Sequence, residues 1–349
     1  MPATTPHWIL GSCRRDLAFL VLPGFVGVAL GWALPAETLA LSAYLLLVTA
    51  VVDSGHVYTT WLRTYANAGE RQHLLYKIVP PTVAATFALW FFLGVGGLWT
   101  FVVYATAFHH VRQFFGVSRW YQKLEGNFRP ATGRFLYALT LLPLFSYHFR
   151  PGATAEFYSE QDLWLHPHEG IYLAFRGAFL IALAGWLIYE VTLFARERRV
   201  EWGRVLSVGG PAGMYAAAFF WGRTPAQVLI PLMLAHGVGY FGMMSLGLVR
   251  TRPNVYPAWG KAMLWVLGFA VVFGSLEGLA ENFVIDFDST YPYRPRGIGE
   301  ALFIGLYLVP LFTHFILDAF IWRGTHREAK ALYSESPPVE RADPFRKSA

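Results

Sequence analysis

The apolar residues of this chain gather in blocks of roughly 18 to 25 residues, separated by short polar segments. A helix of that length crosses the hydrocarbon core of a bilayer, which is about 30 Å thick. Charged residues make up only 14% of the sequence, whereas an average soluble domain carries about 25%. The pattern therefore predicts an all-α, polytopic transmembrane helical bundle and argues against a soluble enzyme.

Ten segments have the length and composition of membrane spans, and we expect them to form one domain over residues 1–324. The first block follows Arg14 and Arg15 but lacks a small-residue cleavage site, so we interpret it as a helix rather than a cleaved signal. The polar residues 325–349 predict a disordered cytoplasmic tail. The predicted spans are residues 17–35, 38–62, 78–97, 99–118, 132–149, 171–195, 204–221, 225–249, 262–281 and 298–322.

The segments between the spans alternate in charge, which predicts their orientation. Lys and Arg concentrate in every second segment, for example Arg119, Lys123 and Arg129 after the fourth span. The segment after the fifth span carries Glu156 and Glu160 instead. Because basic segments stay in the cytoplasm, both termini are predicted to be cytoplasmic, and we expect a bacterial inner membrane. The net charge is +6, but the basic residues lie between the apolar blocks and do not gather on one face. We therefore expect no nucleic-acid partner.

Five of the eleven histidines fall inside predicted spans, and this placement is the most informative feature for function. They are His56 in the second span, His109 and His110 in the fourth, His236 in the eighth and His314 in the tenth. These spans are all even-numbered and run in the same direction. At about 1.5 Å per residue, the histidines lie at similar depths in the cytoplasmic half of the membrane. Four helices therefore offer imidazoles to one interior site.

Each of these histidines also has polar neighbours at helical spacing. Asp53 precedes His56 by three residues, and Asp318 follows His314 by four. Residues three or four apart share one helix face, so each carboxylate is expected to face the same site as its histidine. An Asp at the centre of a membrane helix costs on the order of 2.5–3.5 kcal/mol and usually has a function. Gln113 and Tyr240 accompany His109 and His236 in the same way.

Imidazole and carboxylate together favour iron, copper, zinc or manganese. The single Cys13 excludes a thiolate cage or an iron–sulfur cluster held by this chain. We predict a transition-metal site of one or two ions, with iron as the metal and haem as the alternative. A proton pathway and plain helix packing stay open as other uses of these histidines. The predicted ligands are His56, His109, His110, His236, His314, Asp53 and Asp318.

Arg112 lies one helical turn closer to the cytoplasm than His109. Its guanidinium is a candidate contact for the anionic headgroup of a substrate, together with Arg63 and Arg119 near the same boundary. The alternative is that these side chains extend to the membrane surface without any function.

The arrangement resembles the histidine-rich integral-membrane metal oxygenases, which include fatty-acid desaturases and hydroxylases and the bacteriorhodopsin-related carotene-cleaving dioxygenases. The paired-histidine boxes of the desaturases are absent, and only the His109–His110 doublet is present. The resemblance implies a metal-dependent oxidoreductase that acts on a lipid or another long apolar molecule, and we expect an electron donor as its partner. Two other functions remain open, a haem-binding electron-transfer protein and a proton-coupled transporter.

Overall fold

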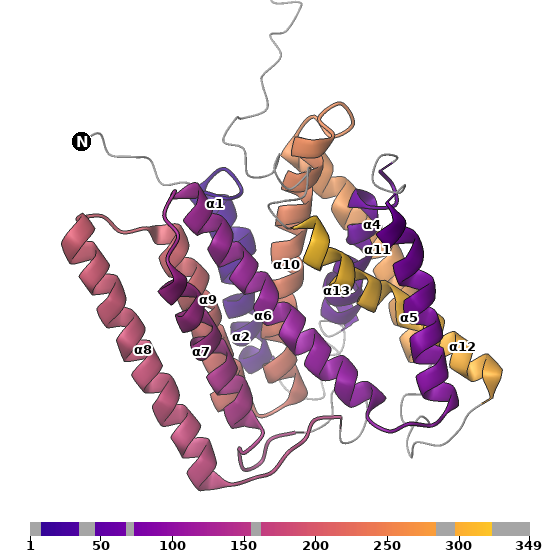
Figure 1. Cartoon of the computed structure of the whole chain (residues 1–349), viewed down its shortest axis with the longest axis horizontal. Helices are drawn as coiled ribbons and strands as arrows, with labels where there is room; N and C mark the ends of the chain where they lie inside the picture. Colours follow the sequence, from indigo (N-terminus) through magenta and orange to yellow (C-terminus); the bar gives the residue numbers. More distant parts are fainter. Residues whose placement is uncertain (1–7, 35–45, 68–72, 155–161, 284–296, 323–349) are drawn as a thin grey trace, which may run out of the picture.

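The computed structural model describes residues 8–34, 46–67, 73–154, 162–283 and 297–322 (Figure 1). Within these ranges the chain is all-helical without a strand, as predicted, and each predicted span overlaps a helical segment. The predicted tail, residues 325–349, lies outside the described residues. With η marking a π-helix, the elements are α1 (Cys13–Asp16), η1 (Leu17–Val21), α2 (Leu22–Ala33), η2 (Leu47–Ser54), α4 (Gly55–Arg63), α5 (Leu74–Phe92), α6 (Leu98–Leu124), α7 (Pro130–Tyr147), α8 (Glu169–Glu197), α9 (Trp202–Ala216), η4 (Ala217–Trp221), α10 (Pro225–Thr251), α11 (Trp259–Phe283), α12 (Ile298–Tyr307) and α13 (Val309–Ile321).

Several described segments are long and apolar enough to cross a membrane. There are six of them in the described part of the chain: Cys13–Ala33, Leu74–Phe92, Glu169–Glu197, Pro225–Thr251, Trp259–Ala280 and Ile298–Ile321. Helix α6, with 27 residues, is also long enough to cross a membrane, but polar residues such as His109, His110 and Arg112 lower its hydropathy. The count of ten spans and the cytoplasmic position of both termini stay predictions.

Helix α10 occupies the middle of the bundle (Figure 1), and most of its side chains are buried. Helix α2 packs closely against it because Gly27 has no side chain: a Cβ atom there would lie 2.7 Å from the Cα atom of Pro231. Small residues allow such close approach between membrane helices. The central position of α10 explains how His236 comes to lie deep inside the protein.

Two groups of helices flank this centre. Helices α7, α8 and α9 lie on one side of α6 and α10, whereas α4, α5, α11, α12 and α13 lie on the other side (Figure 1). Helix α8 turns apolar side chains outward, and Ile181 and Ile188 are 76% and 66% exposed. In water such a surface would be unfavourable, whereas lipid accepts it.

Irregular backbone precedes two of the histidines. The π-helix η2 ends at Ser54, two residues before His56. Helix α12 ends at Tyr307 and α13 begins at Val309, with Pro310 in its first turn. The junction at Leu308 thus lies six residues before His314. Single-turn π-helices inside longer helices are frequent at functional sites. These breaks set the direction from which α4 and α13 enter the centre of the bundle.

Candidate metal centre

The structure brings the five predicted histidines together from α4, α6, α10 and α13. All are buried, with exposed fractions from 0% for His236 and His314 to 9% for His109. The ring centroids of His56 and His236 are 4.6 Å apart, and those of His109 and His314 are 4.7 Å apart. Helices distant in sequence therefore converge on one interior group of imidazoles.

His56 and His236 face each other through their Nε2 atoms, which are 3.0 Å apart. The Nδ1 atom of His56 lies 3.0 Å from the carbonyl oxygen of Val52. Because a carbonyl only accepts hydrogen bonds, Nδ1 of His56 carries the proton and its Nε2 presents a lone pair to His236. Two metal-bound imidazole nitrogens, each about 2.0–2.1 Å from an ion, would have a similar spacing when they subtend a right angle.

His314 is oriented by a chain of hydrogen bonds that ends on a carboxylate. Tyr240 donates its O–H to Oδ1 of Asp318 over 2.8 Å, so the Tyr240 oxygen accepts from the Thr60 hydroxyl at 2.7 Å. Oγ1 of Thr60 in turn accepts from Nδ1 of His314 at 2.7 Å. The proton of His314 is thereby placed on Nδ1, and its Nε2 keeps a lone pair. Metal-binding histidines are commonly oriented in this manner.

Two overlapping groups of ligand atoms follow from this geometry. His56, His236 and His314 form one, and His109, His314 and Asp318 form the other, with ligand atoms within 4.8 Å of one another in each. Nε2 of His109 and Nε2 of His314 are buried and have no hydrogen-bond partner in the described part of the chain. Buried nitrogens without partners are costly, and a bound cation would satisfy both. The donor set therefore fits a metal ion.

Two of the seven predicted ligands do not join these groups. The imidazole of His110 stacks face to face on that of His236, with centroids 4.0 Å apart, and also lines a separate cavity. Asp53 lies in η2 and lines the same cavity. Neither residue contributes an atom to the two described ligand groups. His110 and Asp53 thus lie outside the two ligand groups, although the His110 ring contacts that of His236.

Thr60 is a site residue that the sequence analysis did not single out. It is fully buried and links His314 to Tyr240. A signal for it exists in the sequence, because Thr60 follows His56 by four residues and so shares its helix face. Threonine is common in membrane helices as a packing residue, and this hid its role.

A cavity of about 780 Å³, here called the aromatic cavity, borders the ligand groups at His109 and Asp318. Its other lining residues are mainly rings, among them Phe108, Phe315 and Trp120. Arg112 and Arg119 line it as well, and Arg112 is exposed and donates a hydrogen bond to the hydroxyl of Tyr137. Arg63 is not part of it: this guanidinium is buried and donates to the carbonyl oxygen of Ile321 over 2.7 Å.

Comparison with known proteins adds no further constraint on this site. No family model, no curated protein and no solved structure matches the chain. The functional conclusion therefore depends on the residues and their geometry.

Proposed function

We propose that the chain is a membrane-embedded, metal-dependent oxidoreductase of the oxygenase, hydroxylase or desaturase type, acting on a lipid or another long apolar molecule. One observation carries the proposal: four buried imidazoles and the Asp318 carboxylate converge next to a large aromatic cavity. Nitrogen and carboxylate donors with open positions are the ligand set of non-haem iron oxygenases. The resemblance to the histidine-rich membrane oxygenases supports the same function.

The proposed ligands are His56, His109, His236 and His314, with Asp318 as a fifth ligand or as the anchor of the hydrogen-bond chain to His314. A bound iron would supply electron exchange and an open position for an oxidant. The protein's own contribution is to fix the imidazole tautomers and to keep water out of the site. Neighbouring imidazoles touch edge to face, for example His56 and His314 with centroids 4.9 Å apart, and this contact favours a bare ion over haem.

The aromatic cavity is the proposed position of the apolar substrate. Its lining follows α6 from His109 to Arg119, a rise of about 15 Å at 1.5 Å per residue. A long chain placed along it would reach the ligand groups with one end and Arg119 with the other, and Arg112 lies between them. Guanidinium groups bind carboxylates and phosphates, so an anionic headgroup suits that end of the cavity.

The test is elemental analysis of the purified protein together with its visible spectrum. We expect iron in stoichiometric amount in the wild type and its loss in the His56→Ala and His314→Ala variants. The matched control is His166→Gln, because the His166 side chain is exposed and far from the four ligand-bearing helices in sequence. A Soret band would indicate the haem alternative, and metal-free protein whose activity moves protons would indicate the transporter.

The finer topology is part of the same proposal. Ten spans with both termini in the cytoplasm of a bacterial inner membrane would place reporter fusions after residues 125, 200 and 255 inside. Fusions after residues 160 and 290 would be external. Inversion at two or more positions would remove the shared orientation of the four histidine-bearing helices, and with it access of the site to a cytoplasmic electron donor.

A further inference from the structure

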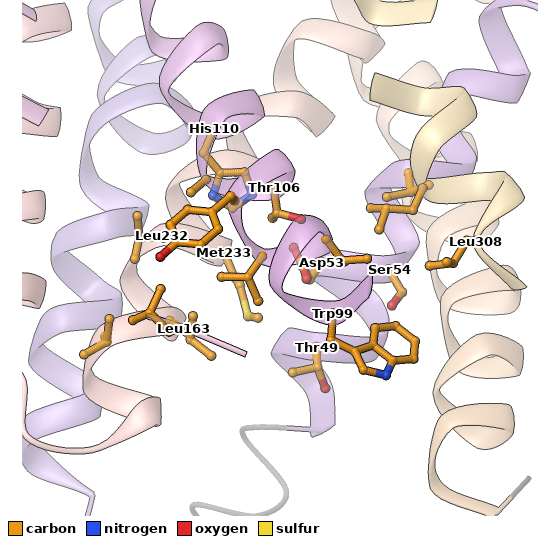
Figure 2. A pocket seen from close by; sticks show the side chains of 18 of the residues that line it. Thr49, Asp53, Ser54, Trp99, Thr106, His110, Leu163, Leu232, Met233 and Leu308 are labelled. Atoms are coloured by element: carbon orange, nitrogen blue, oxygen red, sulfur yellow. The ribbon is translucent and has the colours of Figure 1, made fainter. Parts of the chain in front are cut away.

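A second cavity, here called the His110 cavity, is lined by His110 and shares no lining residue with the aromatic cavity. Its volume is about 380 Å³, within the usual range for small-molecule sites. Apolar side chains such as Leu232, Met233 and Leu308 form much of its wall (Figure 2). A ligand of this cavity would therefore be largely apolar.

Two polar side chains of α6 reach this cavity without a partner. His110 is 5% exposed, and its imidazole has no hydrogen bond within the part of the chain that the structure describes. The hydroxyl of Thr106, one helical turn earlier, is buried and likewise lacks a partner there. Buried polar groups are nearly always hydrogen-bonded, so the Thr106 hydroxyl needs a partner from outside the chain, and the His110 imidazole borders the same cavity and is free to bind that partner too.

Further oxygen atoms line the same wall. Figure 2 shows Thr106, Asp53 and Thr49 following one another along one side of the cavity, with His110 at its end. The carboxylate of Glu277 lines the cavity as well. Other polar residues of the lining, such as Ser54 and Tyr104, lie elsewhere in the wall, and most of the remaining lining residues are apolar. This is the usual composition of a site that orients a small apolar ligand through one polar group.

The donor and acceptor inventory decides which polar group fits. A neutral imidazole and a threonine hydroxyl each offer one donor and at least one acceptor. An ammonium group only donates and would leave the donors of His110 and Thr106 unpaired. A carboxylate only accepts, and it would lie beside the carboxyl groups of Asp53 and Glu277. A hydroxyl group both donates and accepts, so it can satisfy a donor and an acceptor of His110 and Thr106 at the same time.

We propose that the His110 cavity binds an apolar molecule bearing a hydroxyl group, an alcohol or a phenol, which exchanges hydrogen bonds with His110 and Thr106. The ligand would lie one imidazole away from the proposed metal ligands, because His110 stacks directly on His236. The inference deepens the proposed function by adding a second ligand to the same site. Its own evidence, however, is the cavity and its unpaired groups, and it requires no metal.

The experiment measures binding of 1-decanol and 4-decylphenol, and of their methyl ethers, to detergent-solubilised protein freed of metal by a chelator. Since a methyl ether cannot donate, we expect the wild type to bind each hydroxyl compound about fivefold to tenfold more tightly than its ether. Preference for decanol or for decylphenol then identifies an alcohol or a phenol as the ligand. The His166→Gln variant serves as control and should keep the wild-type preference.

Two variants locate the contact. Thr106→Val keeps the shape of the side chain and removes a hydroxyl that has no partner, so the free protein should fold normally. It should lose most of the preference for the hydroxyl compound while its affinity for the ether stays unchanged. His110→Phe keeps a ring on His236 and should behave in the same way; if it fails to fold, the Thr106 variant decides alone.

Equal affinity of the wild type for hydroxyl compound and ether would overturn the proposal, and so would an unchanged preference in Thr106→Val. These outcomes leave the proposed function intact, because binding is measured without metal. Conversely, a protein that never holds metal but prefers the hydroxyl compound would refute the proposed oxidoreductase function. The proposal that the His110 cavity binds a hydroxyl compound would then still stand.

Discussion

Replacing Thr60 by Val tests the hydrogen-bond chain that orients His314. The substitution keeps the branched shape and removes only the hydroxyl that accepts from Nδ1 of His314 at 2.7 Å. The next acceptor, Oδ1 of Asp318, is 3.6 Å away, which is too far for a hydrogen bond. The variant therefore leaves a buried donor without a partner at the centre of the proposed site.

The expected magnitude follows from that geometry. An unsatisfied buried donor costs about 1–3 kcal/mol, so metal-free Thr60→Val should unfold more easily by that amount. Loss of a group that orients a metal-binding histidine lowers metal affinity about 10- to 100-fold. Unfolding by sodium dodecyl sulfate in mixed micelles measures the first quantity, and competition with a chromophoric chelator measures the second.

Thr59→Val is the matched control. Thr59 is also fully buried in α4, but its hydroxyl donates only to the carbonyl oxygen of His56 in its own helix, at 2.7 Å. That carbonyl retains the backbone hydrogen bond of the helix, so this variant should bind metal like the wild type. Equal loss of metal affinity in Thr59→Val and Thr60→Val would refute the reasoning, because the chain through Thr60 would then have no special role.

Three further predictions follow. Asp318→Asn should weaken metal binding about 10- to 100-fold, whereas Asp53→Asn should leave it near the wild-type value, as measured by the same chelator competition. Burial raises the pKa of Glu125, just beyond the end of α6, from 4.5 to about 7. The folded protein then binds more protons than the unfolded chain between these values, so unfolding free energy should fall as pH rises through this window, and Glu125→Gln should flatten the profile. Glu190→Gln should strongly destabilise the protein in mixed micelles, by about 3–5 kcal/mol, because it leaves the buried Arg204 without its ion-pair partner.

The helices were largely predictable because the bilayer imposes a length on apolar segments. The predicted span 225–249 corresponds to α10 at Pro225–Thr251, and 171–195 to α8 at Glu169–Glu197. Hydropathy is less informative for α6 than for α8 or α10, since polar residues such as His109 and His110 lie within it.

The convergence of the histidines was predictable from loop charge and helix rise, but the assignment of individual ligands was only partly so. Asp53 lies in the π-helix η2, where the turn is wider than in an α-helix. The rule that residues three apart share a face therefore does not carry Asp53 to the side of His56. His109 and His110 are adjacent, and about 100° separates neighbours around a helix, so they face different cavities.

The position of His56 also depends on a glycine in the facing helix, which yields a last prediction. A Cβ atom on Gly237 would lie 2.5 Å from the carbonyl oxygen of Val52, the group that binds Nδ1 of His56. Gly237→Ala must therefore displace this carbonyl, and we expect about 1–3 kcal/mol of destabilisation from overpacking together with weaker metal binding. Gly268→Ala in α11 is the control, since nothing lies within 4 Å of its Cβ position; it should stabilise the helix by about 0.5–1 kcal/mol. The two alanine variants are thus expected to shift stability in opposite directions, and a Gly237→Ala protein as stable and as metal-rich as the control would show that α10 can move away without disturbing His56.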